Sequence, residues 1–220
     1  DFDFISADTL TGTRGVVANL ATGAYVDTFG NAETMVSIEG IGGTNRADVL
    51  IGNGVENSFN SLGGADTVNG GGGFDQLSAT YSSGSVSPLA IADQAGGINA
   101  NFTLGKLTFA SGTQVTFTGI ERVRGTVFND VFAGGGLLAG GERAYASFRG
   151  LGGADTYIGS AGVEQIDFSN DRNAGGLSGV QVNLSGTDLH GVLANTVIDG
   201  FGNTETLNET GGQIDNLRGT

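Results

Sequence analysis

Residues 42–77 fall into four rows of nine: GGTNRADVL (42–50), IGNGVENSF (51–59), NSLGGADTV (60–68) and NGGGGFDQL (69–77). One column holds an acid or its amide in every row, and the column two positions later holds a large apolar residue. The acid column comprises Asp48, Asn57, Asp66 and Asp75, and the apolar column comprises Leu50, Phe59, Val68 and Leu77. A register kept over four rows indicates a nonapeptide repeat.

A longer repeat is superimposed on the rows. GVVANL (15–20), GINANF (97–102) and GVQVNL (179–184) follow one another at intervals of 82 residues. LGGADT occurs at 62–67 and again at 151–156, an offset of 89, because seven residues are inserted around 137–144. Residues 1–220 therefore form one continuous repeat array of about two and a half units. Because both ends fall inside a unit, we expect an excerpt from a longer repetitive polypeptide.

Two further echoes support the longer repeat. FGNAET (29–34) returns as FGNTET (201–206), and the pair Ile38-Glu39 returns as Ile120-Glu121. Near the end of the chain, IDNLRG (214–219) resembles ADVLIG (47–52), which opens the first nonapeptide block.

Each row predicts a turn followed by a short strand. Six glycine-rich residues can turn because glycine adopts positive φ, and the remaining three form a minimal strand with one inward apolar side chain. Two rows then make an eighteen-residue coil, and stacked coils make a parallel solenoid. The expected fold is all-β: a right-handed parallel β-roll or β-solenoid of glycine-rich nonapeptide repeats with intervening longer β segments.

The array divides into blocks by composition. Nonapeptide block one covers 42–80 and block two covers 124–168, and connecting β segments cover 1–41, 81–123 and 169–213. The connecting segments alternate apolar and small polar residues, and this pattern predicts longer strands or hairpins that continue the stack or form a small sandwich. The predicted strands are Val16–Leu20, Ala100–Leu104, Thr113–Phe117 and Val180–Leu184.

Composition excludes several classes of function. The chain has 42 glycines, no cysteine, 23 acidic and 9 basic residues, and a net charge of −14. The charge argues against nucleic acid and anionic membranes as partners and favours cations. The lack of cysteine excludes disulfides, thiolate nucleophiles and zinc–sulfur sites. The single histidine, His190, lies in a polar stretch and is read as a surface residue, and no catalytic motif is present, so we expect a protein that is not an enzyme.

The acid column predicts a cation site. In an eighteen-residue coil Asp48 lies beside Asp66 on one edge, and Asn57 beside Asp75 on the other. Carboxylates stacked at about 4.8 Å repel by roughly 3–4 kcal/mol at an effective dielectric of 20, unless a cation lies between them. Calcium suits such a site, because it takes six to eight oxygen ligands, carboxylates and backbone carbonyls together. The alternative is that each aspartate caps its glycine turn and binds no metal.

The rows resemble the hemolysin-type calcium-binding repeats of RTX exoproteins, whose pattern is G-G-x-G-x-D-x-U-x. Gly70–Leu77 matches at every specified position, Gly150–Thr156 and Ser61–Val68 match at most of them, and Gly159–Ile166 matches with Glu164 in place of aspartate. The resemblance implies a calcium-loaded parallel β-roll, type I secretion and folding outside the cell. The residues expected to surround Ca²⁺ are Asp48, Asn57, Gly64, Asp66, Gly73, Asp75, Asp130, Gly153, Asp155, Gly162 and Glu164.

Departures from the pattern predict fewer ions than a full array would hold. Arg46 and Val55 stand where the second turn glycine is expected. Asp130 and Asp155 stack only if the insertion loops out, and Ala146 then opposes Glu164, which leaves that edge with one acid.

Two function classes follow. The first is a calcium-binding structural repeat region of a secreted or cell-surface bacterial protein, such as an adhesin, a matrix protein or a surface-layer component, which folds when it meets calcium after export. The second is the non-catalytic secretion and calcium-binding region of an exported enzyme, such as a protease, lipase or polysaccharide epimerase. In either case the expected partners are calcium ions, flanking repeats of the same longer chain and neighbouring copies in a surface assembly.

Overall fold

The computed structural model describes residues 4–6, 12–80, 93 and 95–219, and these residues form a nearly all-β structure with parallel strands in its sheets. The chain groups into two compact units: unit 1 comprises 1–95 and 105–123, and unit 2 comprises 96–104 and 124–220. Among the described residues the sole α-helix is α1 (Asp171–Ala174), and none is long and apolar enough to cross a membrane. The expectation of an all-β chain is confirmed.

Block one of unit 1 forms strands that pair with the strand eighteen residues away. β6 (Val49–Ile51) pairs in parallel with β8 (Thr67–Asn69), Val49 opposite Thr67. In a second sheet, β7 (Ser58–Asn60) lies between β5 (Gly40–Gly42) and β9 (Gln76–Ser78), all parallel. Successive rows therefore alternate between two sheets, as the nine-residue spacing predicts. β1 (Phe4–Ser6) pairs in parallel with β5.

The apolar column forms the core of block one. Leu50, Phe59, Val68 and Leu77, the middle residues of β6 to β9, are at most 1% exposed. Burying each such side chain contributes about 2–3 kcal/mol, which is the main stabilisation available to strands of only three residues.

A three-stranded meander precedes block one. β2 (Val17–Asn19), β3 (Ala24–Val26) and β4 (Ala32–Thr34) are antiparallel neighbours, and β2 pairs in parallel with β6. β11 (Lys106–Phe109) and β12 (Gln114–Thr118) form an antiparallel pair at the other end of the block, where β12 pairs in parallel with β8. The connecting segments thus form hairpins that join the block's own sheet. β13 (Arg122–Arg124) lies where the chain passes from unit 1 to unit 2.

Unit 2 repeats this arrangement. β14 (Val131–Ala133) pairs in parallel with β10 (Ile98–Asn101) and with β16 (Thr156–Ile158). β16 pairs on its other side with β20 (Thr204–Asn208), which continues antiparallel into β19 (Thr196–Ile198) and β18 (Gln181–Asn183). The second sheet holds β15 (Tyr145–Arg149), β17 (Val163–Asp167) and β21 (Asn216–Arg218), all parallel. The predicted strand Ala100–Leu104 is displaced, because the chain turns after Asn101 with Gly105 at φ 59°.

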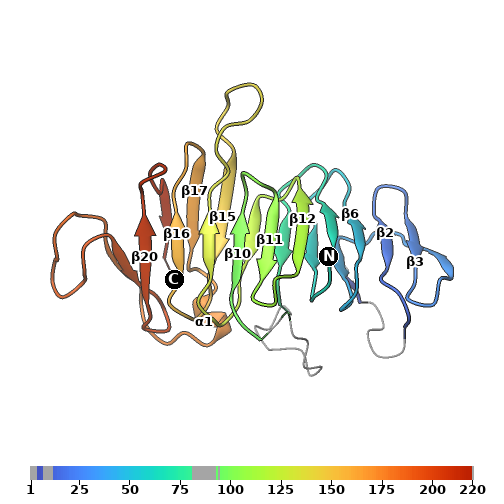
Figure 1. The fold of residues 1–220 in the computed structure, drawn as a ribbon, viewed down its shortest axis with the longest axis horizontal. Helices are drawn as coiled ribbons and strands as arrows, with labels where there is room; N and C mark the ends of the chain where they lie inside the picture. The colour runs from blue at the N-terminus through green and yellow to red at the C-terminus, as the bar shows by residue number, and fades with distance from the viewer. Residues whose placement is uncertain (1–3, 7–11, 81–92, 94, 220) are drawn as a thin grey trace. The chain divides into compact units, whose positions relative to one another are not determined.

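Aromatic rings fill the interior of unit 2. Phe132 stacks on Tyr157 with ring centroids 5.4 Å apart and 8° between the planes, and it stacks on Phe148 at the same separation. All three side chains are fully buried. The insertion departs from the sheets as a short antiparallel loop, closed by a bridge between Leu137 and Arg143 and visible as the protruding loop before β15 in Figure 1.

The resemblance of IDNLRG (214–219) to ADVLIG (47–52) gives the wrong alignment. β21 pairs with β17, the strand that ends block two, whereas β6, formed by ADVLIG, lies in the sheet of the meander. The terminal residues 214–220 (IDNLRGT) therefore correspond to 38–44 (IEGIGGT) and 120–126 (IERVRGT). IDNLRG and ADVLIG both end in a leucine, a variable residue and a glycine, and a glycine-rich repeat contains several such endings. The sequence alone therefore supports more than one alignment.

Phe59→Ala tests the core of block one. We expect a loss of about 3–5 kcal/mol in the free energy of unfolding, because a fully buried ring is replaced by a cavity. Chemical denaturation measures the loss, and Val55→Ala, at a side chain that is 55% exposed, is the matched control and should change stability by less than about 0.5 kcal/mol. Equal effects of the two substitutions would contradict the assigned core.

Candidate metal centre

The structure brings together the acid pairs that the spacing predicts in block one. The Asp48 N–H donates to Asp66 Oδ1 at 2.9 Å, and the Asn57 N–H donates to Asp75 Oδ1 at 2.7 Å. Each carboxylate is therefore turned toward the backbone of the row eighteen residues before it, which lies beside it in the same sheet. All four side chains are at most 2% exposed.

Block two has the same link in spite of its insertion. The Asp130 N–H donates to Asp155 Oδ1 at 2.9 Å, and β14 and β16 pair in register on either side of the looped-out residues. Ala146 lies opposite Glu164, as expected. The acid column thus consists of Asp48, Asn57, Asp66 and Asp75 in block one and Asp130, Asp155 and Glu164 in block two.

Three acids outside the nonapeptide rows extend the acid column, and the sequence reasoning missed them. Glu121 Oε2 accepts the Asp75 N–H at 2.8 Å, and Glu205 Oε2 accepts the Asp155 N–H at 2.6 Å. Asp215 Oδ2 accepts the Glu164 N–H at 3.0 Å. The available signal for Glu121 was the recurrence of Ile-Glu at 38–39 and 120–121, and the signal for Glu205 was the recurrence of FGNAET (29–34) as FGNTET (201–206). An acid that recurs at one position of a repeat is a candidate for a contact that the repeat uses.

Two acids of the column are fully satisfied by hydrogen bonds. Asp48 accepts the Thr44 N–H and the Thr44 hydroxyl at 2.6 and 3.0 Å, and it also accepts the Val16 N–H at 2.7 Å. Asp130 is held in the same way by Thr126 and by the Ile98 N–H. A threonine four residues before the acid therefore supplies a turn cap, which is the alternative role that the sequence left open.

Other acids of the column are not satisfied. Asp66 Oδ2, Asp75 Oδ2 and Glu205 Oε1 are buried and have no hydrogen-bond partner among the described residues. A buried, unpaired carboxylate oxygen is strongly unfavourable, and a proton or a bound cation would satisfy each of these positions.

Burial shifts the protonation of these groups. Desolvation, followed by the charge of Asp48, raises the pKa of Asp66 to about 9, and desolvation raises the pKa of Asp75 to about 6. Desolvation and the charges of Asp155 and Asp199 raise the pKa of Glu205 to about 10. The pKa values of Asp130 and Asp155 are also raised by burial.

The turn glycines lie close to backbone carbonyls at the edge of the sheets where the acid column lies. Gly64, Gly73 and Gly153 have φ of 96°, 116° and 105°, which strongly favour glycine. A Cβ on Gly64 would lie 2.3 Å from the carbonyl oxygen of Arg46, eighteen residues earlier, so these two rows approach too closely for any side chain. Gly162 does not have positive φ, but a Cβ there would lie 2.7 Å from the Ala144 carbonyl oxygen.

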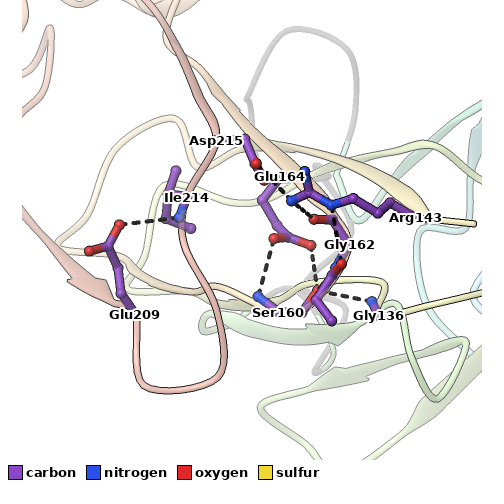
Figure 2. Close-up of polar contacts among 9 residues, drawn as sticks. Gly136, Arg143, Ser160, Gly162, Glu164, Glu209, Ile214 and Asp215 are labelled. Atoms are coloured by element: carbon purple, nitrogen blue, oxygen red, sulfur yellow. Dashed lines mark hydrogen bonds and ion pairs between the residues drawn. The ribbon is translucent and has the colours of Figure 1, made fainter.

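In the turn around Glu164, Arg143 places a positive charge beside Asp215 (Figure 2). The Glu164 carboxylate accepts the Ser160 hydroxyl and N–H at 2.5 and 3.1 Å. Arg143, delivered by the insertion, pairs with Asp215 at 2.7 Å and donates to the carbonyl oxygens of Ala161 and Gly162. The guanidinium thus contacts an acid and two turn carbonyls, the set of oxygens expected around a cation.

The donors of the acid column suit calcium in type. They are carboxylate and carbonyl oxygens, with three buried carboxylate oxygens left unpaired. Within the described residues, no group of three or more His, Cys, Asp or Glu side chains is placed to hold a metal ion, so backbone carbonyls would have to complete any coordination shell. His190 is exposed, in a turn closed by the bridge between Leu189 and Val192.

No protein-family model matches this chain, and a search of the curated proteins finds no significant match.

The raised pKa values predict how stability depends on pH in chelator. The folded Asp66 and Glu205 retain protons up to about pH 9 and 10, whereas the unfolded groups lose them near pH 4. The folded chain binds more protons than the unfolded chain between these limits, so stability falls as pH rises. We expect at least about 2 kcal/mol less stability at pH 6.5 than at pH 5, measured by denaturation in EDTA.

The double variant Asp66→Asn with Glu205→Gln should reduce this slope, because its side chains do not titrate. A wild-type stability that stays level from pH 5 to pH 6.5 would show that these carboxylates are not buried as described.

Arg143→Gln tests the arginine at Glu164. We expect a loss of about 1 kcal/mol in the free energy of unfolding, because Asp215 and two turn carbonyls lose their donor while the ion pair is partly exposed. Arg172→Gln, at an exposed side chain, is the matched control. If the two variants unfold alike in denaturant, Arg143 has no part in holding the turn.

Proposed function

We propose that this chain is the calcium-binding structural repeat region of a secreted or cell-surface protein and that it forms a parallel β-roll. The observation that carries the proposal is the set of buried carboxylate oxygens on Asp66, Asp75 and Glu205 that have no partner among the described residues. Protons can satisfy these groups, but above the pKa of the unfolded carboxyl, about 4, each retained proton lowers stability as the pH rises. At neutral pH a bound cation would satisfy them without this loss of stability.

The strand register supports the β-roll. Strands of block one pair with the strand eighteen residues away and alternate between two sheets, which makes two rows one coil of a roll. Asp66 and Asp75 then lie on opposite edges, each beside the glycine turn of its own row.

Calcium is the cation that fits best. The available donors are hard oxygens, the unpaired atoms belong to carboxylates, and glycine turns place carbonyls of neighbouring rows close together. Calcium accepts irregular sets of such ligands, whereas magnesium requires a near-ideal octahedron. In this role Ca²⁺ would be held by the Asp66, Asp75 and Glu205 carboxylates together with turn carbonyls, and it would supply the charge that lets these groups be ionised and buried.

Such a site would couple folding of the chain to the calcium concentration around it. Without calcium at neutral pH the acid column resists burial, and with millimolar calcium outside the cell the rows stack. The chain would stay unfolded during export and fold on arrival. The repeats would then act as a structural module, with flanking repeats and neighbouring copies as partners.

A calcium titration at pH 7.5 tests the proposal, with circular dichroism reporting β-structure and isothermal calorimetry reporting bound ions. We expect β-structure to form with the ions and magnesium at the same concentration to have little effect. Asp66→Asn and Asp75→Asn should each weaken binding about tenfold or more, since each removes a buried charged ligand, whereas Glu56→Gln, at an exposed carboxylate of the same block, should not.

A chain that is folded in EDTA at pH 7.5 and binds no calcium would overturn the proposal. The carboxylates would then be turn caps alone.

A further inference from the structure

The outer edge of β4 lacks a contact that its counterparts in the repeat make. β4 corresponds to β12 and β20, since the first residues of the three strands, Ala32, Gln114 and Thr204, are 82 and 90 residues apart. β12 pairs in parallel with β8, and β20 pairs in parallel with β16. Within the described part of unit 1, β4 pairs with β3 and no strand lies on its other side.

The strands that occupy the two counterpart edges come from the same sequence. β8 begins with the threonine of LGGADT at 62–67, and β16 begins with the threonine of LGGADT at 151–156. The Thr116 N–H donates to the carbonyl oxygen of Asp66, and the Thr206 N–H donates to that of Asp155, at 2.9 and 2.8 Å. One backbone amide of the meander thus recognises the aspartate of an LGGADT row.

The Thr34 N–H occupies the equivalent position in β4. It lies opposite Ala24, as Thr116 lies opposite Lys106 and Thr206 opposite Thr196. The next amide, Met35 N–H, donates inward to Gly23 at 2.7 Å, so the Thr34 N–H is on the side of the strand away from β3. The edge of β4 therefore carries a donor in the position that binds an LGGADT row elsewhere.

Glu33 adds a second contact of the same kind. Its counterpart in FGNTET is Glu205, which is 0% exposed and accepts the Asp155 N–H at 2.6 Å. Glu33 itself is exposed, as are its neighbours Ala32 and Thr34. Two copies of a motif that differ at one position thus have a buried glutamate where a row is present and an exposed one where none is described.

We propose that the outer edge of β4 binds, in parallel, an LGGADT-type nonapeptide row from a further repeat unit joined in tandem, and that Glu33 and Thr34 hold the aspartate of that row. The Glu33 carboxylate accepts the aspartate N–H and the Thr34 N–H donates to its carbonyl oxygen, as Glu205 and Thr206 do with Asp155. The inference rests on the proposed repeat architecture and not on the calcium site. β4 is an edge strand, and an edge strand that binds a specific row is not free to pair with other chains.

A tandem chain tests this. Residues 97–178, one complete unit, are inserted between Arg14 and Gly15, so that an added LGGADT row precedes β4 as the existing row precedes β20. Thr34 is outside the duplicated segment, so its amide can be followed by hydrogen exchange in NMR. In buffer with calcium we expect Thr34 to exchange about a hundredfold more slowly than in the 220-residue chain, whereas Thr206, which is also outside the duplicated segment, is protected in both.

Substitutions at Glu33 separate docking from general stability. Glu33→Lys should leave the unfolding midpoint of the 220-residue chain unchanged, since the side chain is exposed there. In the tandem chain it should lower the midpoint and restore fast exchange at Thr34, because lysine cannot accept the aspartate N–H. Glu33→Gln retains an acceptor oxygen and should keep most of the protection.

Unchanged exchange at Thr34 in the tandem chain would overturn the inference, and so would an equal effect of Glu33→Lys in the two chains. A tandem chain that does not fold counts against it too, because the added unit is joined at a repeat boundary where the inference requires it to fit. Protection of Thr34 that appears in the 220-residue chain as its concentration rises would make a second copy the occupant instead. If the 220-residue chain binds no calcium and Thr34 is nevertheless protected in the tandem chain, the docking inference stands and the calcium proposal falls.

Discussion

The hydrogen bond from the N–H of one column residue to the carboxylate of the next column residue in the same sheet is the interaction on which this structure depends. It joins rows eighteen residues apart in block one, from Asp48 to Asp66 and from Asn57 to Asp75, and it spans the insertion in block two. Each bond uses one carboxylate oxygen and buries the whole group. The chain thereby gains register between rows too short to specify it by packing alone, and it acquires buried charge that must be neutralised.

The protein stabilises these buried acids in several ways. Thr44 and Thr126 cap Asp48 and Asp130 completely, and Arg143 provides a fixed positive charge beside Asp215 at the Glu164 turn. Asp66, Asp75 and Glu205 have no such partner for one oxygen among the described residues. The proposed calcium sites are the positions where neither a cap nor an arginine is available, so calcium would control the stability of part of the acid column rather than all of it.

Much of this arrangement follows from periodicity. The nine-residue spacing predicted the two alternating sheets, the acid pairs and the buried apolar column, because a strand that repeats every eighteen residues has one way to pair with itself. The spacing could not reveal Glu121 or Glu205, whose longer side chains reach the acid column from outside the nonapeptide rows. It could not reveal Arg143 either, since an insertion breaks the register that made other contacts predictable. The terminal segment was misaligned because IDNLRG fits two places in a glycine-rich repeat.

The central claim is that Asp66 is buried with its Oδ2 unpaired and exchanges a proton for calcium. Carbon-13 NMR of the Asp66 carboxyl carbon measures this directly, in EDTA at pH 5 and in calcium at pH 7.5. The account predicts the chemical shift of a protonated acid in the folded chain in EDTA at pH 5, in accord with a pKa raised to about 9, and that of a carboxylate in calcium at pH 7.5. An ionised Asp66 in folded, calcium-free protein at pH 5 would contradict it.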